Sequence, residues 1–375
     1  MKLAVTQAQL AYGLGIVTRA VSPRSTLPVL NNILLATDEG RLRLSATNLE
    51  LGITCWINAN IEEEGSVTIP ARIFSDLINA LPGEKVNLSL TTRTQTLNIH
   101  CGSSNFDIKG IDAQEFPPMP VPDLSAGVEL NVSDFKDMIH QVNFAASTDE
   151  ARPVLQGVLM EITDNEISLA ATDGFRISVR TAELSSSQVN PVKVIIPARS
   201  LSELARIATD GKGTITMNVP PDRGQAIFHM KNAELVTQLI EGNFPEYRAI
   251  IPRNFKTRTV ISTQEFLKAC KQAEIIAREG NNVIRLSIQP QDGVPGIVEF
   301  STQSEEMGSG EVVVDANIEG PELAIAFNVS YLSEVLDVIG TPNTILETNA
   351  NNTPGLLSPV GNDNFRHVIM PMHID

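Results

Sequence analysis

The feature that most constrains the fold of this chain is a set of sequence patterns that occurs three times. The segment LSATNLELGI at 44–53 returns as LAATDGFRISV at 169–179 and, more loosely, as EFSTQSEEMGSGEVVV at 299–314. VTIPARIFSDLINAL at 67–81 returns as VIIPARSLSELARIA at 194–208 and AIAFNVSYLSEVLDVI at 324–339. The intervals agree: Thr47, Thr172 and Thr302 are 125 and 130 residues apart, and Pro70, Pro197 and Asn328 are 127 and 131 apart. Solenoid repeats span only about 20–50 residues, whereas a whole domain spans about 100–150. The sequence therefore predicts three like domains in a row or an arc.

Composition places the chain among ordinary globular proteins. Its 375 residues exceed what one core usually supports, and 42% hydrophobic with 19% charged residues is a typical soluble composition. The N-terminus lacks the apolar stretch of a signal peptide, and no segment approaches the ~18 apolar residues of a membrane span. Cys55, Cys101 and Cys270 have neither disulfide nor zinc spacing. We therefore expect free thiols and a cytoplasmic location.

Each repeat predicts the same order of elements. A hydroxyl residue precedes an amphipathic helix at Thr6, Ser133 and Thr263, and such residues cap helix N-termini. Alternating segments split by turn residues follow, which is typical of antiparallel hairpins. A second helix follows the IPAR segment, and more strands end the unit. The predicted fold class is α+β, with helices on one side of antiparallel sheet.

Proline-rich stretches at 115–127 and 243–259 mark the domain boundaries. Phe116 and Phe244 are 128 residues apart, so even these linkers repeat. We expect domains at 1–122, 123–252 and 253–375.

The search for catalytic or metal-binding groups finds none. The five histidines are scattered, and the HExxH, GxSxG, GxxxxGK[ST] and CxxC patterns are absent. Asp173-Gly174 is more typical of a turn than of a catalytic carboxylate. The sequence predicts neither an enzyme nor a cofactor or metal site.

A formal net charge of −16 argues against a nucleic-acid partner unless the charge is segregated. The expected helices, at 7–21, 72–81, 134–142, 199–208, 264–278 and 330–338, carry eight cations and eight anions. The negative charge would then lie in strands and loops, and a face lined by helices would be positive relative to the rest. Ordinary solvated helix surfaces explain the same count.

The last segment, FRHVIMPMHI at 365–374, has two interpretations. An apolar terminal segment is typical of a final core strand, whereas methionine-rich surfaces form adaptable pockets for peptides. The sequence leaves both open.

Several segments together resemble the bacterial sliding clamp family, the β subunit of DNA polymerase III. They are SPRSTLPVLNNILL (22–35), ARPVLQG (151–157), ATDGFR (171–176), EGNFPEYR (241–248), FNVSYL (327–332) and VIMPM (368–372). The resemblance covers the whole chain. It implies a DNA-encircling processivity clamp without catalysis, in which two three-domain protomers join head to tail into a six-domain ring lined by helices.

The resemblance also implies binding residues. A peptide pocket between the second and third domains would accept short Leu- and Phe-bearing motifs of the polymerase, the clamp loader and repair proteins. Its expected members are Leu155, Thr172, Gly174, Phe175, Arg176, Ile177, Pro245, Ile250, Val368, Ile369, Met370, Pro371 and Met372. Phe175 stands where a histidine is common, and His373 where an arginine often follows.

Double-stranded DNA would be bound without sequence preference by Arg24, Arg72, Arg152, Arg199, Arg206, Lys268 and Lys271. The homodimer would pair strand 103–108 with the third domain of the partner, bringing Phe106 and Ile108 to Ile275 and Ile276. The alternative is an enzyme built on a three-domain frame, for which no catalytic group is visible.

Overall fold

The computed structural model describes residues 1–22, 26–120, 127–184, 191–209, 211, 213–221, 223–279, 281–291, 295–304 and 306–373. The chain divides into two compact units, one of residues 1–133 and 199–239 and the other of residues 134–198 and 240–375. The division passes through the central third of the chain because the strands of that third join two different sheets. Arg24 lies outside the described residues.

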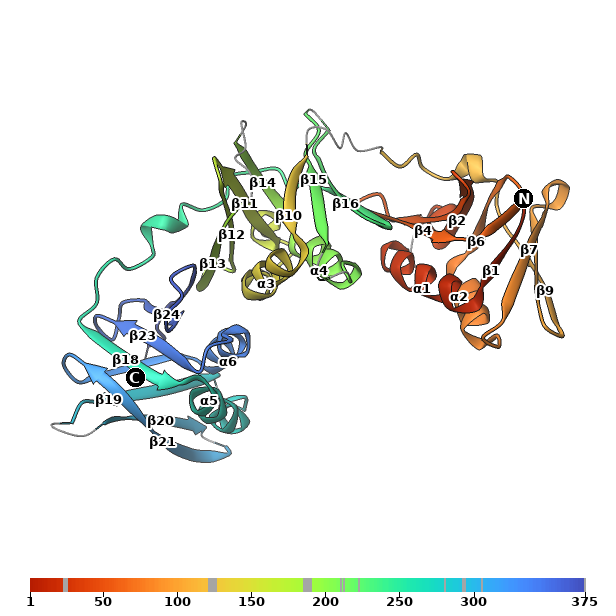
Figure 1. Cartoon of the computed structure of the whole chain (residues 1–375). Coiled ribbons are helices and arrows are strands. Elements are labelled where there is room, and N and C mark those ends of the chain that lie inside the picture. Colours follow the sequence, from red (N-terminus) through yellow and green to blue (C-terminus); the bar gives the residue numbers. More distant parts are fainter. Residues whose placement is uncertain are drawn as a thin grey trace. The chain divides into compact units, whose positions relative to one another are not determined.

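The first unit holds two antiparallel sheets. One has the order β10 (Val128–Asn131), β15 (Thr214–Asn218), β16 (Gln225–Met230), β17 (Ala233–Gln238), β4 (Leu51–Asn58), β3 (Arg41–Thr47), β2 (Asn32–Asp38) and β6 (Ser66–Pro70). The other has the order β5 (Asn60–Glu63), β1 (Lys2–Thr6), β7 (Lys85–Thr91), β8 (Thr96–Cys101) and β9 (Ser104–Lys109). The helices are α1 (Gln7–Val17), α2 (Ala71–Ala80) and nearly all of α4 (Ala198–Ile207), with short turns η1 (Thr18–Ala20), η2 (Pro28–Asn31), η3 (Thr92–Thr94) and η4 (Ala113–Glu115). Helices α1 and α2 lie side by side (Figure 1).

The second unit is built on one antiparallel sheet of twelve strands. Its order is β14 (Val192–Pro197), β11 (Gly157–Thr163), β12 (Glu166–Thr172), β13 (Arg176–Glu183), β25 (Phe365–Ile369), β24 (Gly355–Pro359), β23 (Asn343–Thr348), β18 (Thr257–Ser262), β21 (Gly308–Glu319), β20 (Gly296–Ser304), β19 (Val283–Gln289) and β22 (Leu323–Asn328). The helices are α3 (Val132–Val142), most of which belongs to this unit, α5 (Thr263–Ala277) and α6 (Val329–Val338), with η6 (Asn143–Ala145), η7 (Pro153–Gln156) and η8 (Tyr247–Ala249). Figure 1 shows α5 and α6 packed side by side on the C-terminal strands.

The predicted apolar stripes form the cores. On α5, Phe266, Cys270, Ala273 and Ala277 are all buried, and they pack with the fully buried Phe300 of β20. The rings of Phe266 and Phe300 lie 5.3 Å apart. Burying one such large side chain stabilises the fold by about 1.5–3 kcal/mol, so helical spacing of apolar residues is enough to dock α5 on its sheet. Among the described residues, no helix is both long enough and apolar enough to cross a membrane.

The predicted hairpins and second helices are present, but the start of each repeat differs from expectation. A short strand, β1, β10 or β18, precedes the first helix of each third. Four to six residues are too few to show clear alternation, and these strands are held by pairing with distant strands, such as β1 with β7. Thr6 caps α1, accepting a hydrogen bond from the Gln9 amide.

Two predicted helix caps are wrong. Helix α3 already begins at Val132, so Ser133 lies inside its first turn. Helix α5 is capped by Ser262, which accepts from the Glu265 amide, while the Thr263 hydroxyl donates to the carbonyl of Thr341.

Strand register also corrects the alignment of the repeats. Pro70, Pro197 and Asn328 pair with Asn32, Gly157 and Val283, which are the first residues of three equivalent strands. Leu35, Met160 and Leu286 each lie three residues after the first residue of their strand, and they pair with Leu44, Leu169 and Phe300. These three partners are therefore equivalent. Gln303, rather than Thr302, therefore occupies the place of Thr172.

Candidate functional site

A tight loop between β12 and β13 forms the rim of the expected peptide pocket. The Thr172 hydroxyl donates to the carbonyl of Arg176 at 2.6 Å and accepts from the amide of Gly174 at 3.0 Å. Gly174 has a φ of 97°, which side chains rarely adopt, and a Cβ there would come within 3.3 Å of Arg152 Nη1. The loop leaves Phe175 with 60% of its surface exposed.

Arg176 lies beneath this loop and is buried. Its guanidinium pairs with Asp173 at 3.0 Å and with Glu334 of α6, and it donates to the carbonyl of Phe144 at 2.9 Å. It also lies 4.2 Å from the centre of the Tyr331 ring. This differs from the expectation that Arg176 faces a peptide: its donors are engaged, and it connects the pocket loop to the C-terminal third of the chain. Sequence reasoning missed Glu334 and Tyr331, because they lie far from the loop in sequence.

The base of the expected pocket is apolar. Ile177 of β13 is paired with Val368 of β25, and both belong to a buried cluster that includes Tyr247 of the linker. Ile369 differs from expectation. As the next residue on β25, it has its side chain on the opposite face, where it is fully buried in the C-terminal core.

Exposed apolar side chains surround this base. The Met370 amide donates to the carbonyl of Phe175 at 2.9 Å, which brings the chain end to the loop. Met370 is 40% exposed and Ile250 is 44% exposed. Pro245 is exposed as well, and Leu155, Pro371 and Met372 are half-buried. Residues 365–369 form a core strand, as the first interpretation of the last segment predicted, and Met370 lies outside it. The pocket interpretation stays a prediction.

The expected DNA-binding cations differ in how free they are. Arg199 of α4 and Lys268 of α5 are exposed and, among the described residues, form no ion pair. The other four cations that the structure describes have carboxylate partners: Arg72 with Asp76 at 3.9 Å, Arg206 with Glu203 at 2.8 Å, Lys271 with Asp337 at 2.9 Å and Arg152 with Asp149 at 2.8 Å. Arg152 also donates to the Asp173 carbonyl at 2.9 Å, so it braces the pocket loop. The amide of Ala151 and the Arg152 side chain lower the pKa of Asp149.

The expected charge balance of the helices needs correction. Arg19 and Arg278 lie beyond the ends of α1 and α5. Of the eight expected cations six remain in helices, against eight anions, so the helices carry −2 and the rest of the chain −14. Spread over 67 helical residues and 308 others, these charges make the helices only slightly less acidic per residue than the remainder. Helix α1 has no charged residue at all.

Among the described residues, two strand edges are free where the dimer contact is expected. β9 pairs only with β8, and residues 308–315 of β21 pair only with β20 among the described residues. Phe106 on β9 is 43% exposed and Ile275 on α5 is 71% exposed, while Ile108 and Ile276 are half-buried. Within the described ranges, no cluster of His, Cys, Asp or Glu could hold a metal ion.

Comparison with known proteins identifies the family. Residues 1–120, 129–246 and 248–373 match, in order, the N-terminal, central and C-terminal domains of the DNA polymerase III beta subunit. This chain belongs to the beta sliding clamp family. The beta sliding clamp of Synechococcus elongatus is 32% identical to it over 100% of both chains, and that of Staphylococcus aureus is 36% identical over 94% of both. Solved sliding clamps from Bacillus subtilis and Pseudomonas aeruginosa cover 100% of both chains, with 29% and 27% identity and TM-scores of 0.94 and 0.91.

These similarities confirm the resemblance predicted from sequence, the three-domain α+β fold and the clamp function. The chain is a sliding clamp that serves DNA replication, and members of this family are non-catalytic. The enzyme alternative is therefore discarded.

Proposed function

We propose that this sliding clamp encircles duplex DNA as a ring of two copies joined head to tail, and that it holds the polymerase and other replication and repair proteins through the peptide pocket. The observation that carries the proposal is a strand junction that occurs twice within the chain. Counterparts of its two strands, β9 and residues 308–315 of β21, each have one edge without a partner among the described residues.

Two junctions inside the chain are built alike. In the first unit β4 pairs with β17 and places Ile53 opposite Leu235. In the second unit β13 pairs with β25 and places Ser178 opposite His367. β4 and β13 occupy the same place in their repeats, as do β17 and β25. The remaining counterparts are β21 and β9, and within the described ranges residues 308–315 of β21 and the whole of β9 have one edge free. A head-to-tail contact of this kind closes into a ring when its rotation fits.

The same register predicts the contacts of the dimer. By strand pairing, Gly310 of β21 corresponds to Ser178, and by its hairpin Phe106 of β9 corresponds to His367. Gly310 would therefore lie opposite Phe106 of the partner subunit. A Cβ on Gly310 would come within 3.1 Å of Ile276 Cδ1, so the glycine leaves room for that ring to cover the end of α5.

The inner junction supports this arrangement. There the His367 ring stacks on Phe144 with centres 5.4 Å apart. Phe144 lies 131 residues before Ile275, which is the offset between the second and third repeats. Ile275 would thus take the place of Phe144 and pack against Phe106 of the partner subunit.

DNA contact would fall to cations on the weakly charged helices. Arg199 and Lys268 are free to reach phosphates, whereas Arg72, Arg206 and Lys271 would exchange a carboxylate for a phosphate. Exposed ion pairs contribute only about 0–1 kcal/mol, so exchanging the carboxylate for a phosphate costs little free energy. Contacts to phosphates position a protein without reading sequence, and few of them permit movement along the duplex.

The peptide pocket would use Phe175, Ile250 and Met370 around the base formed by Ile177 and Val368. Leu155, Thr172, Gly174, Pro245, Pro371 and Met372 complete the proposed wall. An apolar concave surface with a few backbone groups suits a Leu or Phe side chain of a short peptide.

Retention on DNA tests the proposal. Purified protein loaded on a nicked circular plasmid should stay bound through gel filtration at high salt, and cutting the circle to a linear form should release it. Release from both forms at the same rate would show ordinary surface binding and overturn the encircling function.

A further inference from the structure

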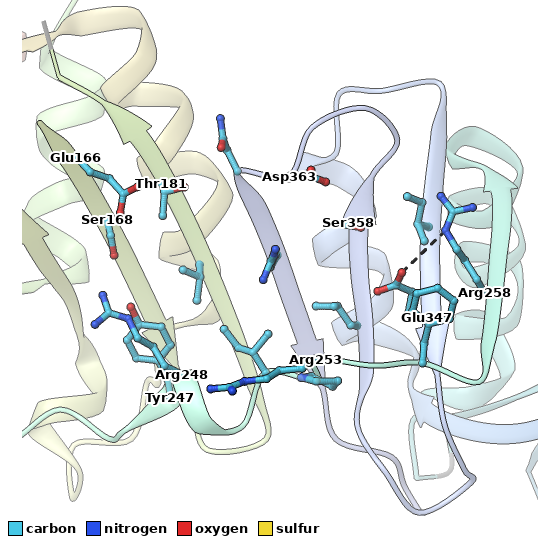
Figure 2. Close-up of a pocket in the computed structure, with 18 residues that line it drawn as sticks. Glu166, Ser168, Thr181, Tyr247, Arg248, Arg253, Arg258, Glu347, Ser358 and Asp363 are labelled. Carbon is cyan, nitrogen blue, oxygen red and sulfur yellow. Dashed lines mark ion pairs between the residues drawn. The ribbon is translucent and has the colours of Figure 1, made fainter.

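The second unit carries a groove of about 720 Å³ next to the peptide pocket (Figure 2). Its walls are strands β12 and β13 on one side and β23, β24 and β25 on the other, and the linker at 247–255 runs along it. Nothing in the proposed clamp function uses this groove.

The floor of the groove is continuous with the base of the pocket. Val179 and Arg366 are strand partners, two residues along β13 and β25 from Ile177 and Val368. Residues two apart on a strand share a face. Tyr247 belongs to the same apolar cluster as Ile177 and Val368, and it also lines the groove. One face of the sheet therefore carries both sites, with the linker between them.

The charge of the groove differs from that of the chain. Four arginines and three carboxylates line it, whereas the whole chain has a net charge of −16. Arg248 is engaged by Glu161 at 2.7 Å, and Arg258 lies 3.9 Å from Glu347. Figure 2 shows Arg248 and Arg253 on the linker, with Arg258 and Glu347 across the groove.

Among the described residues, two of the four arginines, Arg253 and Arg366, form no ion pair. Arg366 nevertheless acts on Glu347, whose pKa is raised by burial against the opposing effects of Arg258 and Arg366. Arg366 is also not required by the repeated fold, because its counterpart at the junction of β4 and β17 is Glu234. An exposed ring, Phe255 at 46% exposure, lies in the same groove.

We propose that this groove binds an acidic segment of the partner polypeptide that flanks the Leu- or Phe-bearing motif held in the peptide pocket. Arg253 and Arg366 would receive its carboxylates, since guanidinium matches carboxylate geometry with two parallel hydrogen bonds. Phe255 and the apolar floor would receive one of its apolar side chains. The inference rests on the proposed function for the position of the motif.

A peptide suits the groove better than a nucleic acid. Glu166, Glu347 and Asp363 line the groove together with the arginines, and a continuous phosphate backbone along it would meet these carboxylates. A peptide can place carboxylates beside arginines and amides beside the acids. It can also reach the groove, because eight extended residues span about 26 Å.

Binding of a peptide series to the full-length protein, followed by fluorescence anisotropy, tests the proposal. The first peptide carries only a QLxLF-type motif. The second adds eight residues with four Glu or Asp and one Phe, at either end in turn, and the third adds eight Gly and Ser residues. We expect the acidic extension to tighten binding about tenfold and the neutral one to change it by less than twofold. The gain should shrink at high salt.

Two variants show whether the gain in affinity comes from the groove. Arg253→Glu should abolish it and leave the motif-only peptide unaffected, whereas the exposed Arg223→Glu, in the other unit, should preserve it. Met370→Ala should weaken every motif peptide. An acidic extension that adds nothing, or a gain that survives Arg253→Glu, would overturn the proposal.

Cross-linking separates the remaining outcomes. A benzophenone at the Phe position of the acidic segment, without the motif, should label residues 247–258. If the motif-only peptide failed to bind, the proposed pocket would be wrong. The labelling would still show whether the groove binds the acidic segment. Labelling elsewhere would count against a peptide site. So would displacement of the acidic segment by a single-stranded oligonucleotide, if the acidic extension also gave no gain in peptide affinity.

Discussion

At the scale of single residues, equivalent loops of the first two repeats share a hydrogen-bond pattern, but the two loops have different roles. The Thr47 hydroxyl donates to the Leu51 carbonyl at 3.0 Å, as that of Thr172 does to the carbonyl of Arg176. In the second loop the residue after the turn is an arginine whose charge is paired on α6. At the equivalent place the first loop has an ordinary strand residue, whereas the arginine of the second loop connects two domains.

Glu234 provides a prediction at this scale. It is buried on β17, and burial raises its pKa to about 7 against the opposing effect of Arg43. His229 Nδ1 lies 3.4 Å from it, and burial lowers the pKa of that imidazole. A raised carboxyl pKa means that the folded state binds the proton more tightly than the unfolded state. The stability that Glu234 contributes is therefore fully present below pH ~4.5 and is lost as the pH rises through about 7.

Glu234→Gln should remove this loss. We expect the variant to match the wild type near pH 4.5 and to exceed it by on the order of 3 kcal/mol at pH 8. Thermal unfolding at several pH values measures the difference. The exposed Glu129→Gln serves as the control and should follow the wild type. Parallel pH profiles for Glu234→Gln and wild type would show that Glu234 titrates normally.

At the scale of elements, strand edges decide assembly. An unpaired edge is a template for another strand, and the chain presents one such edge on β9 and one on β21. Apolar side chains lie exposed beside both edges, Phe106 at the first and Ile275 at the second. The repeated junctions β4–β17 and β13–β25 show how such edges are satisfied.

Ile275→Glu together with Ile276→Glu should yield monomers, because two carboxylates would be buried against Phe106 of the partner subunit without a counter-charge. Gly310→Val should weaken the dimer by filling the space opposite that ring. Ile73→Glu, an exposed isoleucine on α2, is the matched control and should remain dimeric. Sedimentation velocity measures the result. A dimer that persists in the Ile275/Ile276 variant would show that the interface lies elsewhere.

At the scale of the whole molecule, charge is divided between the helices, at −2, and the rest of the chain, at −14. A weakly charged lining favours loose contact with phosphates, which suits movement along DNA. Tight binding would require many phosphate contacts and a steep dependence on salt.

Arg199→Ala with Lys268→Ala should weaken DNA binding about equally for unrelated duplex sequences. The slope of log K against log salt should become shallower by roughly one for each phosphate that the variant no longer neutralises. Lys231→Ala, in an exposed turn, should leave the slope unchanged. Titrations of two duplexes at several salt concentrations measure both effects. Weakening confined to one duplex would indicate base reading, contrary to the proposal.

The sequence alone determined the threefold repeat, the helices, the hairpins and the apolar stripes, because these depend on local spacing. It also placed Phe175, Ile177, Ile250 and Met370 in one candidate site through family resemblance. Short strands such as β1 escaped it, since their pairing partners lie about 80 residues away.

Only the tertiary structure decided which of the resembling residues are available. Arg176 and Ile369 are matched in sequence but buried, one by charges on α6 and the other by alternation along β25. Arg253 and Arg366 come from the linker and the last strand, and they share a groove only because β25 pairs with β13. Local spacing specifies an element, but exposure and ion pairing depend on which distant segment packs against it, and that is a property of the folded chain.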